Sequence, residues 1–190
     1  KEDYFREIHE IYKSGLDNHA LLPNGMLSPM TYYNIVISGL KVNAFDWVAW
    51  FIPHYKNNLD RPHRDSAYSF NMARLHFAQR NYGEALLLLQ KANYRDMLTN
   101  LSAKTMALKI YYEQGEHEVL QSHLDAMNNY LRRNRVIGYH RENYLNLIRT
   151  TKRMLALPKG KGSAKEILRS QIKTTDPLTE RAWFLEMLEK

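Results

Sequence analysis

A chain of 190 residues, 44% of them hydrophobic, is long enough for one domain or a short helical repeat array with a sizeable core. It contains no cysteine, which excludes disulfides, thiolate catalysis and cysteine-ligated metals, and which fits a cytoplasmic protein without requiring one. The formal net charge is +7, and residues 130–190 hold 14 Lys or Arg against 6 Asp or Glu, so the excess lies in the last third. Such an asymmetry points to an anionic partner.

Hydrophobic periodicity predicts an all-α protein of about ten helices, and no segment has the alternation of a strand between hairpin turns. No run of about 18 apolar residues occurs, so we expect no membrane span. The expected helices are 2–14, 29–42, 44–57, 64–80, 82–95, 99–114, 116–133, 137–156, 163–174 and 177–190. Ser28-Pro29, Asp176-Pro177 and the capping-box pair Ser163 and Glu166 mark three of the starts.

The first helix, 2–14, has no preceding partner in this sequence. We interpret it as the second helix of a repeat whose first half lies upstream; a natural cap would also explain it. Because the sequence begins with Lys1 rather than with methionine, we expect it to be the C-terminal part of a longer polypeptide.

The six helices between 29 and 133 repeat one pattern. A helix opens with an aromatic residue, a small or apolar residue follows three positions later, and apolar residues continue at helical spacing. Three copies, 37 and 35 residues apart, follow this pattern in whole or in part: Phe45, Val48 and Ile52; Tyr82, Ala85 and Leu89; Leu120 and Leu124. A period of this length built from two helices indicates a helical repeat protein.

Residues 67–92 resemble one tetratricopeptide repeat, with Ala73 at the small position of the first helix and Tyr82, Ala85, Leu89 and Ala92 at the expected positions of the second. The flanking copies lack the small residues, and the family's early tryptophan and closing proline are absent. The resemblance covers residues 29–133 and implies a right-handed superhelix, or α-solenoid, of antiparallel helix pairs. We assign residues 1–157 to these repeats and 158–190 to C-terminal capping helices of the same domain.

The resemblance implies a non-catalytic scaffold for protein–protein interaction. In this family the first helix of each pair lines the concave groove, and the residues so placed here are Tyr33, Ile37, Phe70, Arg74, Phe77, Lys109 and Tyr112. Aromatic residues beside Arg and Lys suit a peptide partner. The alternative is that they only pack against neighbouring helices. The carboxylate clamp of chaperone-binding members is not reproduced, because only Asn71 matches it.

The basic residues of the last third form the competing surface. Between 132 and 173 there are twelve Lys or Arg and two acidic residues, and we expect a continuous positive face that folding does not neutralise. Its proposed members are Arg132, Arg133, Arg135, Arg141, Arg149, Lys152 and Arg153. Such a face attracts nucleic-acid phosphates or an acidic protein. Since no base-reading motif accompanies it, a protein partner is favoured, and a merely solvated face is the remaining alternative.

No residue is nominated for catalysis, cofactor binding or metal binding. The eight histidines include no ligand-spaced pair on one helix face; His117 and His123, for example, lie about 120° apart around a helix. The segment 160–163 lacks the residue order of a phosphate-binding loop, and no predicted strand precedes it.

Overall fold

The structure is a computed structural model that describes residues 2–91, 96–134, 139–158 and 162–190. These residues form ten α-helices and two short 3-10 helices, with no strand among them, so the prediction of an all-helical protein with ten helices is confirmed. The elements are α1 (Glu2–Asp17), η1 (Pro23–Gly25), α2 (Pro29–Lys41), α3 (Phe45–His54), η2 (Lys56–Asn58), α4 (Arg61–Ala78), α5 (Tyr82–Lys91), α6 (Met97–Glu113), α7 (His117–Arg133), α8 (Tyr139–Leu155), α9 (Gly162–Thr174) and α10 (Arg181–Glu189). In the described ranges, no helix has the length and apolarity to cross a bilayer.

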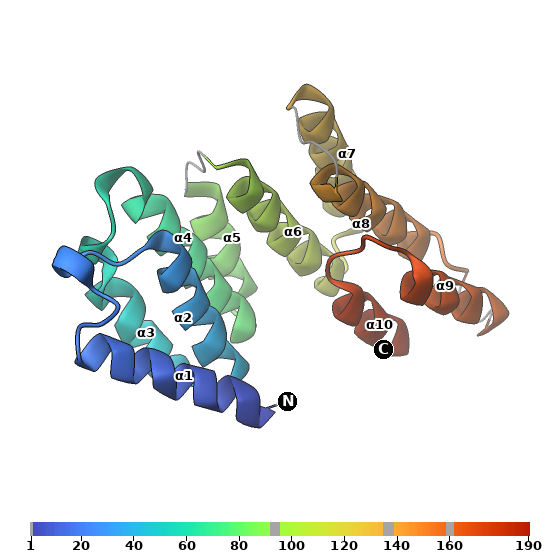
Figure 1. The fold of residues 1–190 in the computed structure, drawn as a ribbon. Coiled ribbons are helices and arrows are strands. Elements are labelled where there is room, and N and C mark those ends of the chain that lie inside the picture. The colour runs from blue at the N-terminus through green and yellow to red at the C-terminus, as the bar shows by residue number, and fades with distance from the viewer. Residues whose placement is uncertain (1, 92–95, 135–138, 159–161) are drawn as a thin grey trace. The chain divides into compact units, whose positions relative to one another are not determined.

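The chain divides into two compact units, residues 1–96 and 97–190, which Figure 1 shows from blue to green and from green to red. This division falls well before residue 157, and α9 and α10 belong to the same unit as α6, α7 and α8. Each unit has its own core. The first includes Leu16, Leu27, Tyr32, Ile35, Val36, Val48, Phe51, Ile52, Leu59, Ala67 and Leu75. The second includes Leu101, Leu108, Leu120, Leu124, Met127, Leu131, Tyr144, Leu147, Ile148, Met154, Leu168, Ile172, Leu178, Trp183, Phe184, Met187 and Leu188.

Three helix hairpins carry the repeated sequence pattern. Helix α2 packs on α3, α4 on α5 and α6 on α7, and three residues join the two helices of each pair. A connection that short makes packed neighbours antiparallel. In the first unit α4 also packs against α2 and α3, so the first helices of two successive pairs lie side by side.

The three hairpins share one turn. Its central residue has a left-handed backbone, with φ of 57° at Asn43, 61° at Arg80 and 72° at Gly115. In each turn, the next residue donates its backbone N–H to a carbonyl five residues earlier: Ala44 to Gly39, Asn81 to His76 and Glu116 to Tyr111. These 6→1 bonds, with the accompanying 5→2 bonds, define the Schellman motif that ends a helix. The spacing of 37 and 35 residues seen in the sequence therefore recurs in the backbone.

The same register recurs in the core. One position on the first helix of each hairpin is fully buried: Val36, Ala73 and Leu108. One position in the first turn of each second helix is also fully buried: Val48, Ala85 and Leu120. The apolar residue four positions later on each second helix is buried as well: Ile52, Leu89 and Leu124. The period in the sequence is thus a period of buried positions. Ala92 lies outside the described residues.

Helix α10 begins later than predicted. The expected start at Pro177 is wrong, because the helix begins at Arg181, after Glu180 with φ of 59°. The segment before it bonds to α8 instead: Asn146 donates to the Pro177 carbonyl at 3.0 Å, and Thr179 N donates to Asn143 Oδ1. By contrast, the start at Ser28-Pro29 is confirmed, since Ser28 Oγ accepts a hydrogen bond from the Thr31 backbone N–H at 3.0 Å.

Candidate functional site

An arginine set against two aromatic rings lies where α2 and α4 meet in the first unit. The Arg74 guanidinium carbon is 4.4 Å from the ring centre of Phe70 and 5.8 Å from that of Tyr33. The two rings meet edge to face, with their centres 6.0 Å apart. Phe70 is only 3% exposed, whereas Tyr33 and Arg74 are half-buried. Three of the predicted groove residues, from two successive first helices, are therefore in one contact group.

The other two groove residues of this unit, Ile37 and Phe77, are also half-buried. Ile37 lies one turn after Tyr33 on α2, and Phe77 lies three residues after Arg74 on α4. The ring of Phe77 tilts against Tyr82 at the start of α5, with 5.7 Å between ring centres. We call the group Tyr33, Ile37, Phe70, Arg74 and Phe77 the α2–α4 surface.

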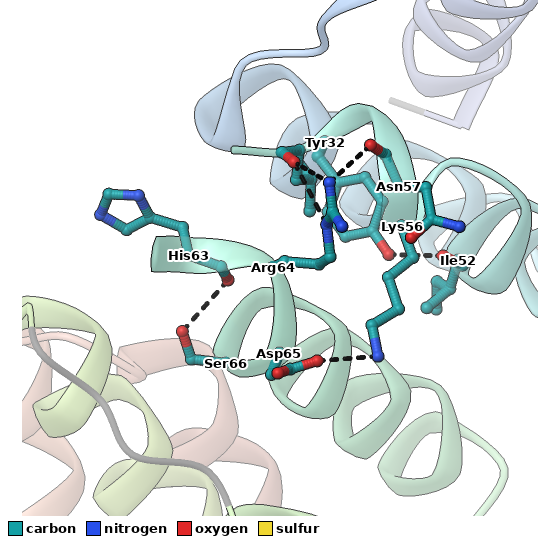
Figure 2. Close-up of polar contacts among 9 residues, drawn as sticks. Tyr32, Ile52, Lys56, Asn57, His63, Arg64, Asp65 and Ser66 are labelled. Carbon is teal, nitrogen blue, oxygen red and sulfur yellow. Dashed lines mark hydrogen bonds and ion pairs between the residues drawn. The ribbon is translucent and has the colours of Figure 1, made fainter. Parts of the chain in front are cut away.

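Polar contacts at the start of α4 fix the direction of that helix, as Figure 2 shows. Arg64 donates from Nη2 to the carbonyls of Asn57 at 2.8 Å and Leu59 at 2.9 Å, so its guanidinium satisfies backbone acceptors in the α3–α4 connection. Lys56 Nζ lies 2.8 Å from Asp65 Oδ1 across the same connection. The Lys56 ammonium, which donates a hydrogen bond to the exposed Asp65 carboxylate, lowers the pKa of that group.

A buried tyrosine ties α2 to the end of α3. The Tyr32 hydroxyl donates to the Ile52 carbonyl at 2.7 Å (Figure 2). Tyr32 is fully buried, and burial raises the pKa of its hydroxyl, which stays protonated as the donor. Since α3 ends at His54, the last carbonyls of the helix have no donor partner within it, and the Tyr32 hydroxyl supplies a donor to one of them. These contacts orient the helices that carry the α2–α4 surface.

The two groove residues predicted in the second unit contact its last helix. Lys109 Nζ lies 2.9 Å from Glu180 Oε2 and 5.7 Å from the ring centre of Trp183. The Tyr112 ring meets Trp183 edge to face at 5.3 Å, and burial raises the pKa of Tyr112. Trp183 Nε1 donates to Glu113 at 2.8 Å. For Lys109 and Tyr112 these contacts favour packing within the unit over an open peptide site.

Sequence reasoning missed the two residues that make these contacts, one just before α10 and one within it. Glu180 and Trp183 lie about 70 positions from the residues of α6 that they contact, outside the repeated pattern. Nothing in the sequence around Glu180 and Trp183 indicates that these two side chains contact α6.

The predicted basic face is in part neutralised. Arg149 Nη1 lies 2.9 Å from Glu142, and Lys152 Nζ lies 2.7 Å from Asp125 of α7. Arg153 donates to the Gln171 side-chain oxygen at 3.2 Å. Arg132, Arg133 and Arg141 are exposed and form no ion pair in the described part of the chain. Arg135 lies outside the described residues.

Surface aromatics of α3 form a second cluster that the sequence did not single out as a site. Trp50 is 48% exposed and stacks on His54, with 4.5 Å between ring centres. Its neighbour Trp47 stacks on the buried Phe51 and meets His9 of α1 edge to face. Among the described residues, no group of three or more His, Asp or Glu is placed to hold a metal ion.

Comparison with models of known families, with curated proteins and with solved structures finds no significant match to this chain. The tetratricopeptide resemblance consequently depends on the residues of this chain alone.

Proposed function

We propose that this chain is a non-catalytic protein–protein interaction module, a degenerate tetratricopeptide-like α-solenoid, and that it binds a peptide segment of its partner on the α2–α4 surface. The repeated turn and the repeated buried register, 37 and 35 residues apart, support the assignment to a helical repeat. Repeat proteins of this kind use adjacent helices to present extended binding surfaces.

The observation that carries the binding proposal is the packing of Arg74 on Phe70 and Tyr33. A guanidinium held against aromatic rings is pre-organised, so a partner that bonds to it loses less side-chain entropy than with a free arginine. Arginine and tyrosine are also among the residues that most often dominate binding energy at interfaces. The half-buried Ile37 and Phe77 supply apolar area on the same two helices.

Peptide selection tests this function directly. Random peptides displayed on phage are selected on the full chain, and the affinities of enriched peptides are then measured by calorimetry. Arg74→Ala and Tyr33→Ala should each weaken binding by about tenfold or more. Trp50→Ala is the matched control, because it removes an exposed aromatic from α3 rather than from α2 or α4.

Circular dichroism of each variant establishes that the helices are retained. If Trp50→Ala weakens the peptides as much as Arg74→Ala does, the binding site is not the α2–α4 surface. If no peptide is enriched more strongly by selection on the wild-type chain than by selection on the Arg74→Ala variant, the proposal of a peptide-binding function fails.

A further inference from the structure

The end of the α7–α8 hairpin lies within a stretch of sequence that carries arginines and no acidic residue. Residues 126–141 include four arginines and no acidic residue. Helix α7 ends at Arg133, α8 begins at Tyr139, and the two helices pack together. Arg132, Arg133 and Arg141 therefore lie at the same end of the hairpin, and all three side chains are exposed.

The two carboxylates that border this stretch in sequence are engaged elsewhere. Asp125 is 2.7 Å from Lys152, and the hydrogen bonds from Lys152 and Gln121 lower its pKa. Glu142 is 2.9 Å from Arg149. Both acids are thereby committed to other bases, and the three arginines have no ion partner among the residues that the structure describes.

Helix electrostatics explain only part of this arrangement. Arg132 and Arg133 complement the negative end of the α7 dipole, as basic residues in a last turn commonly do. Arg141 is the third residue of α8, where the dipole end is positive and a cation is unfavourable. An anionic ligand at this end of the hairpin would offset that repulsion.

Exposed rings stand among the arginines. Tyr139 is 64% exposed at the first position of α8, and its ring meets the exposed His140 ring nearly perpendicularly, with 5.8 Å between centres. Aromatic faces beside arginines are what single-stranded nucleic acids use, since bases stack on the rings and phosphates contact the guanidinium groups. An acidic peptide would use the arginines but would leave the rings without a matched partner.

We propose that the hairpin end formed by Arg132, Arg133, Tyr139, His140 and Arg141 binds single-stranded nucleic acid without reading its sequence. The arginines contact backbone phosphates, and Tyr139 stacks on a base. This site is independent of the α2–α4 surface, because its residues lie in the other unit and its ligand is of another class.

Fluorescence anisotropy tests the site with the full chain and labelled oligothymidylate and oligouridylate of about 20 nucleotides, titrated between about 50 and 200 mM salt. The triple variant Arg132→Gln, Arg133→Gln, Arg141→Gln should lose at least tenfold in affinity. It should also flatten the logarithmic salt slope by about 2, because each phosphate contact on a single strand contributes about 0.7. The control removes three exposed positive charges in the other unit, by Arg6→Gln, Lys41→Gln and Lys91→Gln, and should change affinity less than twofold.

Substitution of Tyr139 separates stacking from charge. Tyr139→Ala should weaken binding several-fold with the salt slope unchanged, and Tyr139→Phe should retain wild-type affinity because the ring is kept. The proposal is overturned if the wild-type chain binds neither oligonucleotide at about 50 mM salt, or if the control triple variant loses as much affinity as the site variant. Displacement of the oligonucleotide by polyglutamate of equal length at equal concentration would overturn it in favour of an acidic protein.

Discussion

At Gly39 three helices come into close contact. A Cβ added to this residue of α2 would lie 2.5 Å from Val48 Cγ2 of α3 and 3.2 Å from His9 Cε1 of α1. Val48 is fully buried and β-branched, so its methyl group has little freedom to move away. The absence of a side chain at position 39 is therefore a packing requirement.

Gly39→Ala should destabilise the first unit by about 1–3 kcal/mol through overpacking. Urea denaturation followed by circular dichroism measures the change. The control is Gly83→Ala in the first turn of α5, where an added Cβ meets nothing within 4 Å. That substitution should be neutral or stabilise by up to about 1 kcal/mol. Equal effects of the two substitutions would contradict the close contact at Gly39.

His9 and His123 are two histidines whose surroundings favour the neutral ring. The Ser38 hydroxyl donates to the Ile35 carbonyl at 2.8 Å, so His9 Nδ1–H donates to Ser38 Oγ at 3.3 Å. His123 donates from Nε2 to the Lys104 carbonyl at 2.8 Å. Burial lowers the pKa of both side chains from the ordinary value of 6.5.

Stability should consequently fall as the pH drops through and below 6.5. Because the folded-state pKa values of both histidines lie below 6.5, the unfolded state binds protons first as the pH falls. The stability that the neutral rings contribute is therefore complete above pH 6.5 and is lost progressively at lower pH. Urea midpoints at pH 7.5 and 5.5 measure the loss. A double variant, His9→Gln and His123→Gln, should show a smaller difference between the two midpoints; an unchanged difference would assign the pH dependence to other groups.

At the scale of elements, the repeated helix–helix turn is made by three different residues in one backbone conformation. Asn and Gly adopt the left-handed region readily, which accounts for Asn43 and Gly115. Arg80 occupies the same position in the middle hairpin, where its Cβ makes that conformation costly.

Introducing glycine at this turn position should therefore stabilise the protein, and removing glycine from it should destabilise the protein. Arg80→Gly should stabilise by about 0.5–1 kcal/mol, since relief of the left-handed strain exceeds the entropy cost of glycine. Gly115→Ala should destabilise by about 1 kcal/mol or more, and Asn43→Gly should change stability by a few tenths. Thermal denaturation of the three variants measures the series. Destabilisation by Arg80→Gly would mean that the arginine side chain, rather than the turn, determines stability there.

At the scale of the whole molecule, the two units have separate cores with separate tryptophan reporters. Trp47 and Trp50 lie in the first unit, and Trp183 packs in the core of the second. Leu124 is fully buried in the second core. A substitution at Leu124 therefore removes contacts within the second unit.

Leu124→Ala should destabilise the second unit by about 2–5 kcal/mol through a cavity. Two backgrounds separate the units: with Trp47 and Trp50 replaced by Phe, fluorescence reports on the second unit, and with Trp183 replaced by Phe, it reports on the first. Leu124→Ala should lower the denaturation midpoint more in the background that keeps Trp183. Equal shifts in the two backgrounds would mean that the chain unfolds as one cooperative body.

Features that depend on neighbouring residues were predictable from the sequence. A helix needs only periodic apolar positions and end signals within a few residues, so the ten helices, the cap at Ser28 and the 37- and 35-residue spacing could all be read. Burial at Val48, Ala85 and Leu120 followed for the same reason, because each lies on the apolar face of its own helix.

Which elements meet was decided only by tertiary structure. The α2–α4 contact brings Arg74 onto Tyr33, 41 positions away, and the ion pair of Lys109 with Glu180 joins residues 71 positions apart. Asp125 neutralises Lys152 from another helix, and bonds to α8 delay the start of α10 to Arg181. Periodicity specifies the face that a helix buries, whereas the partner of that face depends on the packing of all the helices together, which no local pattern encodes.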